Sequence, residues 1–124
     1  MDGRDPLTYE VIGAAIEVHR MLVPGLLESV YEECLCHELK LRGIEHIRQA
    51  PLPVVYKGLK LDHGYRIDVY FPARLVVEIK AVDAIAPVHE AQLLTYLRLS
   101  NVHVGLLINF YVPFLKDGIK RMVL

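Results

Sequence analysis

Residues 65–80 read YRIDVYFPARLVVEIK, two runs of alternating apolar and polar residues on either side of Pro72-Ala73-Arg74. Alternation with a period of two is typical of half-buried strands, and a proline at the break between them indicates a turn. The stretch therefore predicts a β-hairpin with its loop at the proline.

The length of the loop determines which residues of the hairpin face each other. A three-residue loop pairs Phe71 with Leu75, and three pairs further along it sets Asp68 opposite Glu78. A loop with an even number of residues would set a carboxylate opposite Val77 instead. We therefore expect the odd loop to bring two carboxylates to within about 5 Å of each other.

Two carboxylates at this distance need a compensating positive charge, because they repel by roughly 4 kcal/mol at an effective dielectric near 20. Lys80 lies two residues after Glu78, on the same face of its strand, and supplies one such charge. A hard divalent cation, Mg²⁺ or Mn²⁺, would supply the rest and leave positions open for water and a phosphate oxygen. Asp68 and Glu78 are therefore candidate metal ligands. Lys80 is a candidate catalytic lysine that orients or deprotonates water, or holds the phosphate.

Two predicted helices carry further candidates. In a helix expected over residues 86–99, Gln92 and Tyr96 lie four apart on one face. The Gln92 side chain can donate to a phosphate or hold Lys80, and Tyr96 can stack or hydrogen-bond. The alternative interpretation is that both residues simply belong to the polar face of the helix and have no catalytic role. Glu28, near the start of a helix expected over residues 26–42, could give the metal a third carboxylate, or could merely favour the helix dipole. We assign Tyr31, three residues later, to the core.

The remaining elements complete the predicted order α α β β β β α β, one mixed α/β domain over residues 1–124. A first helix begins after the Asp5-Pro6 cap and ends near Leu22. Before the hairpin we expect strands at 46–50 and 52–57, broken by Pro51 and Pro53 and so suited to a sheet edge. After it follow an apolar strand at 102–110 and, from Val112, a turn with a candidate edge strand.

Charge and hydrophobic content indicate which kinds of partner and location the protein can have. The net charge is −1, but residues 40–80 carry eight bases and four acids, so the middle of the chain is where a polyanion would be attracted. A balance so near neutral does not support strong non-specific nucleic-acid binding. The 53% hydrophobic content favours a buried face between two copies. No secretion signal and no apolar run of about 20 residues is present, so we expect a cytoplasmic protein without membrane spans.

Several catalytic classes are disfavoured. The six histidines lack the i, i+4 pair of a zinc-binding helix, the glycines form no phosphate-binding loop, and no Gly-x-Ser-x-Gly elbow is present. Cys34 and Cys36, two apart in a predicted helix, point about 200° apart, so they neither pair nor share a metal.

The candidate residues resemble a known motif set. Asp68, nine residues, and then Glu78-Ile79-Lys80 is similar to the Asp and Glu-X-Lys core of the PD-(D/E)XK nuclease superfamily. Residues 92–96, QLLTY, resemble the Q-x-x-x-Y motif of its RecB-like exonuclease branch, and residues 25–31, GLLESVY, match the signature of the GxxExxY family within that superfamily. The likeness runs from Leu7 to Arg121.

The resemblance implies a restriction-endonuclease-like fold, a four-stranded mixed central sheet flanked by helices. It also implies these roles: metal ligation by Asp68, Glu78, the Ile79 backbone carbonyl and Glu28, catalysis by Lys80, and support by Gln92 and Tyr96. The chain departs from the family at Val23, where a glycine is usual, and at Ile67, where the superfamily often has proline.

Together these observations predict a Mg²⁺- or Mn²⁺-dependent nuclease that hydrolyses phosphodiester bonds of DNA by metal-activated water, with RNA not excluded. A homodimer or a larger nucleic-acid-processing assembly would supply the substrate groove of so small a chain. Two alternatives stay open: a catalytically weak binding or regulatory module with a nuclease fold, and a hydrolase of small phosphodiesters.

Overall fold

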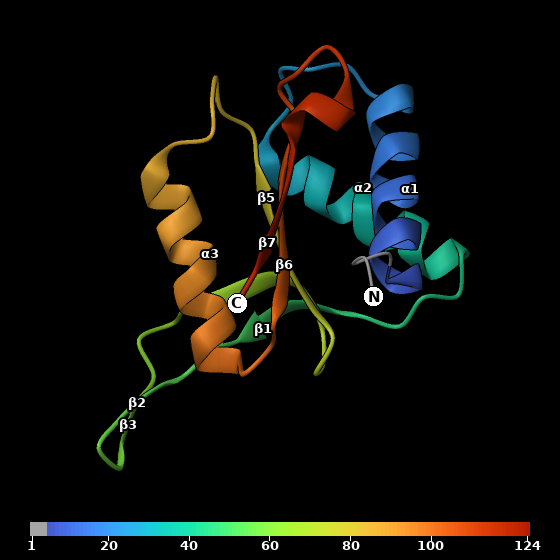
Figure 1. Ribbon diagram of the computed structural model, residues 1–124. Helices are drawn as coiled ribbons and strands as arrows, with labels where there is room; N and C mark the ends of the chain where they lie inside the picture. Colours follow the sequence, from blue (N-terminus) through green and yellow to red (C-terminus); the bar gives the residue numbers. More distant parts are fainter. Residues whose placement is uncertain (1–4) are drawn as a thin grey trace.

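The protein, seen here in a computed structural model, is described over residues 5–124 and begins with two helices (Figure 1). Asp5 caps α1 (Pro6–Met21), since its Oδ1 accepts a hydrogen bond from the Leu7 backbone N–H at 3.0 Å. After α2 (Glu28–Leu41), Gly43 adopts a φ of +71°, which ends the helix. Residues 1–4, which the domain prediction includes, lie outside the described part.

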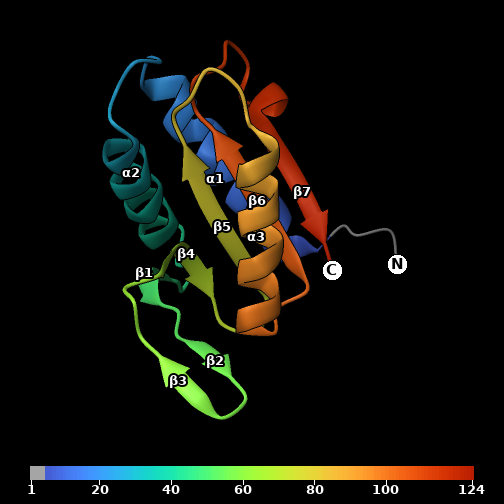
Figure 2. The ribbon, with the colours of Figure 1, turned by 90° about the vertical axis from the view of Figure 1, so that its left-hand side faces the viewer.

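A five-stranded sheet lies between these two helices and α3 (Pro87–Ser100) (Figure 2). Its strands are β1 (Ile47–Pro51), β4 (Arg66–Phe71), β5 (Leu75–Lys80), β6 (Val104–Asn109) and β7 (Ile119–Val123), in the order β1-β4-β5-β6-β7. Only β5 and β6 pair in parallel, and α3 is the crossover between them. The expected mixed sheet flanked by helices is confirmed, with β1 at an edge.

Both faces of the two central strands are buried. Val77 and Leu106 pack against α1 and α2, whereas Val76 and Leu107 pack against Leu93 and its neighbours on α3. A strand covered on both sides needs apolar residues at nearly every position, which explains the continuous apolar runs of β5 and β6. Within this buried sheet, a charged residue such as Glu78 is an exception that calls for an explanation.

The sheet has one strand more than the four that the resemblance implied. Residues 119–123 form β7, which follows the short 3-10 helix η1 (Leu115–Gly118) and pairs antiparallel with β6. This is the candidate edge strand of the C-terminal tail.

The strand predicted over residues 52–57 is confirmed in part, since residues 54–56 are extended, but it does not join the main sheet. The chain instead forms a separate two-stranded hairpin, β2 (Val54–Tyr56) and β3 (Leu59–Leu61), which projects from the body of the molecule (Figure 1). Lys57 and Gly58 turn the chain with φ of +46° and +85°, the positive angles that tight two-residue hairpin turns require. A returning strand of three residues is too short to show a period in the sequence.

The three-residue loop between β4 and β5 is confirmed. Phe71 pairs with Leu75 and Val69 with Val77. Arg74 donates its backbone N–H to the Phe71 carbonyl at 2.9 Å, while Ala73 adopts a φ of +64°. The same register, continued by one pair, sets Asp68 opposite Glu78.

Tyr31 belongs to the core, as expected, and it also holds the loop before α2. Its ring stacks on Phe110 at 4.7 Å between centroids. Its hydroxyl donates to the Val23 carbonyl at 2.6 Å and accepts from the Leu26 N–H at 3.2 Å. In residues 5–124, no helix has the length and apolarity to span a membrane.

Replacing Tyr31 by Phe should lower the free energy of unfolding by about 1–3 kcal/mol, because it leaves the Val23 carbonyl and the Leu26 N–H without their buried partner. Urea unfolding measures this, with Tyr9→Phe as the control, since Tyr9 is 78% exposed. Equal stability of Tyr31→Phe and the wild type would show that the hydroxyl does not hold the loop.

Candidate active site

The carboxylates of Asp68 on β4 and Glu78 on β5 each accept a hydrogen bond from the backbone of the opposite strand. The backbone N–H of Asp68 donates to Glu78 Oε2 at 2.8 Å, and the backbone N–H of Ile79 donates to Asp68 Oδ2 at 2.8 Å. Regular pairing of the two strands stops at Val69 and Val77, so the carboxylates take the place of the next ladder bonds. Both acids are thereby fixed at the point where the strands separate.

Burial makes the ionised form of both acids costly. Glu78 is only 4% exposed, and burial first, then the charge of Asp68, raises its pKa to about 8. Burial also raises the pKa of Asp68 to about 6, and the charge of Glu32 adds to the effect. Lys80 acts in the opposite direction on both groups. One lysine does not balance the pair, which leaves the site short of positive charge.

A third acid near this pair, Glu32, was not among the predicted site residues. Glu32 lies on the second turn of α2 and is 6% exposed. Its Oε2 accepts from Arg48 Nε at 2.7 Å, and its Oε1 accepts from Gln49 Nε2 at 2.8 Å. Gln49 Nε2 also donates to Asp68 Oδ1 at 3.1 Å, so one amide links the two carboxylates.

Gln49 makes this link from an unusual backbone conformation. Its φ is +54° although it lies within β1, opposite the position of Asp68. A non-glycine residue in the left-handed region costs about 1–3 kcal/mol and is found mostly at functional sites. The strained position directs the amide toward Glu32 and Asp68.

Glu28 lies one turn before Glu32 as the first residue of α2, and it is exposed. The acid that raises the pKa of Asp68 and of Glu78 is Glu32. The i, i+4 spacing of the two glutamates, with buried Tyr31 beside them, is the signal that could have pointed to Glu32. The role expected for Glu28 stays a prediction.

The remaining candidates lie around the carboxylates. Lys80 ends β5, partly buried, two residues after Glu78. On α3, Gln92 Nε2 donates to the Tyr96 hydroxyl at 3.3 Å. Burial first, then the charges of Glu78 and Asp68, raises the pKa of Tyr96. The Ile79 side chain packs in the core, while its N–H binds Asp68.

The donor set suits a divalent cation, although it is not a complete cage. Nowhere in residues 5–124 do three His, Cys, Asp or Glu side chains converge closely enough to hold a metal on their own. Mg²⁺, however, is usually bound by one or two carboxylates and keeps several waters and substrate oxygens. Two carboxyl groups fixed side by side, which an arriving cation can deprotonate, fit that pattern.

A family comparison agrees with this geometry. Residues 5–122 match the model of the PD-(D/E)XK nuclease superfamily. The chain belongs to this superfamily. The motif resemblance at Asp68 and Glu78-Ile79-Lys80 is thus confirmed at the level of the superfamily, and the mixed sheet is its restriction-endonuclease-like fold. Searches among curated proteins and solved structures found no match.

Without divalent ions, the protein should lose stability as the pH rises from about 4.5, the ordinary pKa of Glu78, to about 8, its raised value. In this window the folded state keeps a proton that the unfolded state has released, so raising the pH favours unfolding. Glu78→Gln removes the effect. Urea unfolding in EDTA at pH 5, 6.5 and 8 measures this. The free energy of unfolding of Glu78→Gln should rise relative to that of the wild type at each step in pH.

The exposed acid Glu10 provides the control, because Glu10→Gln should follow the wild type at each pH. A stability difference between Glu78→Gln and the wild type that stays constant from pH 5 to 8 would contradict the assigned cause.

Proposed function

We propose that this protein is a divalent-metal-dependent nuclease that hydrolyses phosphodiester bonds of DNA. The observation that carries the proposal is the pair of carboxylates of Asp68, half-buried, and Glu78, buried. Each accepts a backbone N–H of the opposite strand, and Lys80 lies two residues after Glu78, in a chain of the PD-(D/E)XK superfamily. GLLESVY and QLLTY support its placement in the GxxExxY family and near the RecB-like branch.

Asp68, Glu78 and the Ile79 carbonyl would hold Mg²⁺ or Mn²⁺, with a further carboxylate from α2. When bound, the ion supplies activation of water and neutralises charge that develops on the phosphate. The reciprocal backbone bonds keep both acids in place before the ion arrives, so little reorganisation is needed on binding.

The other residues act on water and phosphate. The Lys80 ammonium orients the attacking water and donates to a phosphate oxygen, since it lies beside the carboxylates that set the water's position. Gln92 fixes the Tyr96 hydroxyl through their hydrogen bond, and Tyr96 in turn borders Glu78. These two supports limit the positions that the phosphate can take.

We further propose that residues 5–122 act as one nuclease domain in the cytoplasm, as a homodimer or within a larger nucleic-acid-processing assembly. Two free cysteines suit a reducing compartment. Large exposed side chains such as Met21, Leu27 and Val88 suit contacts with further protein.

A catalytically weak binding or regulatory module is the second candidate. The near-neutral net charge favours it, because a chain that grips nucleic acid unaided usually carries a clear excess of bases. A hydrolase of small phosphodiesters would use the same ligands.

Purified protein with Mg²⁺ or Mn²⁺ should degrade DNA, and Asp68→Asn and Lys80→Ala should each lose at least about 100-fold in rate while staying folded. Single-stranded DNA, duplex DNA and RNA, compared in one assay with circular dichroism of each variant, measure this. Lys116→Ala, at an exposed lysine of η1, is the control.

The failures of this assay are informative. If nothing is cut, yet divalent ions raise the melting temperature of the wild type and not of Asp68→Asn, the binding module is correct. If only a small diester is cut, the third function replaces the nuclease. Equal rates for the wild type and Asp68→Asn would overturn the site.

A second experiment separates the two acids of α2. The burial of Glu32 and its link through Gln49 to Asp68 favour Glu32 as the further ligand, whereas the family signature favours Glu28. We expect Glu32→Gln to weaken Mn²⁺ binding about 10- to 100-fold in calorimetric titration, and Glu28→Gln to weaken it less. Glu33→Gln is the control, since Glu33 also lies near Arg48 but is exposed. The reverse order would assign the ligand to Glu28.

A further inference from the structure

The β2–β3 hairpin, residues 54–61, is here called the hairpin arm. It forms its own two-stranded sheet, and Figure 2 shows it extending beyond the strands of the main sheet. Isolated two-stranded hairpins are at best marginally stable in water. The arm nevertheless exposes Val55 by 60%, Tyr56 by 61% and Leu59 by 57%. An exposed apolar projection of this kind indicates a binding surface.

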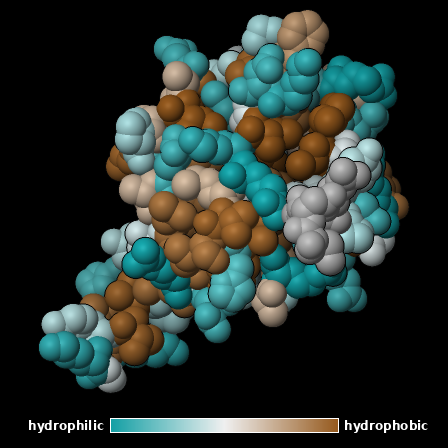
Figure 3. Space-filling view, in the orientation of Figure 1, coloured by the Kyte–Doolittle hydropathy of each residue, from teal (hydrophilic) through white to brown (hydrophobic). Residues whose placement is uncertain are grey.

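The two faces of the arm differ in character. Tyr56 pairs with Leu59 and Val54 with Leu61, and these alternate pairs share one apolar face. Val55 and Lys60 form the pair on the other face. Apolar surface accordingly runs along the arm, with hydrophilic side chains at its tip (Figure 3).

Basic side chains lie at the tip of the arm and on the face opposite the apolar one. Lys57 at the tip lies with its Nζ 5.4 Å from the centre of the Tyr56 ring. With Lys60 and Arg66 it makes three bases against one acid over residues 54–66. That acid, Asp62, accepts a hydrogen bond from the Gly64 N–H at 3.1 Å, a local turn contact. The arm therefore combines an aromatic ring and cations, the chemistry that binds unpaired nucleic acid.

The root of the arm adjoins the candidate active site. The Leu52 N–H donates to the Tyr65 carbonyl at 2.9 Å and closes the root. The Tyr65 ring lies edge-on to the Tyr96 ring, 6.4 Å between centroids, and Tyr96 borders the carboxylates. At about 3.3 Å per residue, the four steps from Leu52 to Tyr56 reach about 13 Å from the root of the arm.

We propose that the hairpin arm binds an unpaired stretch of the nucleic-acid strand that enters the active site, with bases on Tyr56 and Leu59 and phosphates on Lys57 and Lys60. The inference rests on the proposed nuclease function. An unpaired strand fits better than a duplex, because paired bases hide the faces that an exposed ring would stack on. A second copy fits less well, because a two-fold contact would bring the lysines of both arms together.

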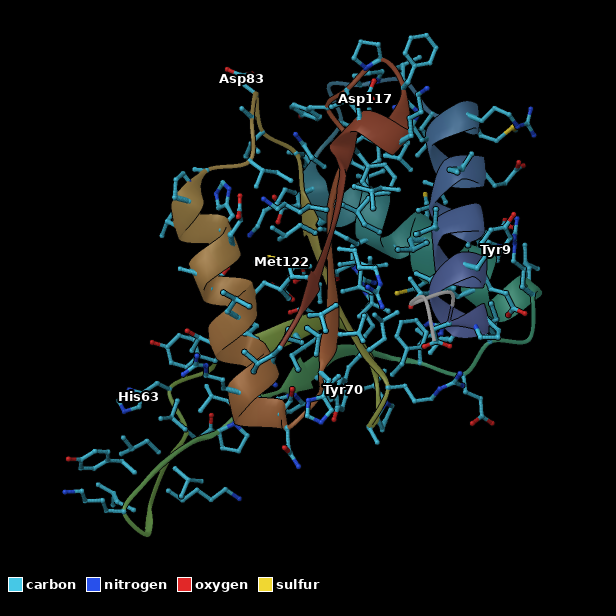
Figure 4. All side chains as sticks on the ribbon, in the orientation of Figure 1. Tyr9, His63, Tyr70, Asp83, Asp117 and Met122 are labelled. Atoms are coloured by element: carbon cyan, nitrogen blue, oxygen red, sulfur yellow. The ribbon has the colours of Figure 1, made fainter. Side chains whose placement is uncertain are left out.

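Binding of a fluorescent 15-nucleotide single-stranded DNA, measured by anisotropy in EDTA, tests the arm without cleavage. Tyr56→Ala should weaken binding about 5- to 100-fold. The double variant Lys57→Ala/Lys60→Ala should lower the slope of log Kd against log salt by about 1.4, or 0.7 for each phosphate contact. Tyr9→Ala, at an exposed ring of α1 far from the arm (Figure 4), and Lys116→Ala are the controls and should bind like the wild type.

Hydrolysis of bis(p-nitrophenyl) phosphate separates this inference from the proposed function, because the small diester does not reach the arm. Tyr56→Ala should cleave it at the wild-type rate with Mn²⁺, while its KM for the long strand rises. If the wild type cleaves neither the small diester nor the long strand but binds DNA in a way that depends on Tyr56, the nuclease proposal fails. The proposal that the arm binds nucleic acid is then still supported.

Three results would overturn the proposal that the hairpin arm binds an unpaired strand. The first is an unchanged affinity of Tyr56→Ala for single-stranded DNA, or no binding by the wild type. The second is tighter, Tyr56-dependent binding of a duplex of equal length. The third is a dimer in sedimentation that Tyr56→Ala dissociates without affecting DNA affinity, which would show that a second copy covers the face.

Discussion

The hydrogen bonds that fix the Asp68 and Glu78 carboxylates to the backbones of the opposite strands are the constraint on which the rest of the site depends. Each carboxylate accepts a backbone N–H of the opposite strand, at 2.8 Å in both cases, where regular pairing of β4 and β5 has ended. The bonds satisfy backbone donors that the separating strands would otherwise leave unpaired. They also fix two acids side by side where two inner strands of a sheet covered on both faces separate, so that structure and chemistry use the same contacts.

This arrangement lowers the stability of the folded protein when the two carboxyl groups are ionised. Burial and mutual repulsion favour protonated carboxyls, and Lys80 offsets only part of the effect. Glu32, the neighbouring acid, is instead compensated by Arg48 and by the Gln49 amide. The strain at Gln49 and the raised pKa values of Asp68 and Glu78 lie within one cluster of contacts. Perturbed groups of this kind gather at functional sites, which supports the proposal of a cation at this position.

Much of the fold could be predicted from particular residues. The odd loop at Pro72 set the hairpin register, Asp5-Pro6 and Gly43 marked helix ends, and uniform apolar runs marked the central strands. Glu32 was missed because an acid in a helix usually faces solvent, and only the positions of Arg48 and Gln49 bring it inward. The returning strand of the arm, β3, was missed because a strand of three residues carries no period. Tertiary contacts, not local pattern, determine both.

The proton balance of Mn²⁺ binding tests the central claim most directly. Because the pKa of Glu78 is about 8, an ion that binds Asp68 and Glu78 at pH 7 must displace about one proton. Calorimetric titration in two buffers of different ionisation enthalpy measures that number. The account predicts a release of about one proton per ion at pH 7, falling toward zero by about pH 9.5, and absent in Glu78→Gln. Tight binding with no proton release, or the same release in Glu78→Gln, would contradict it.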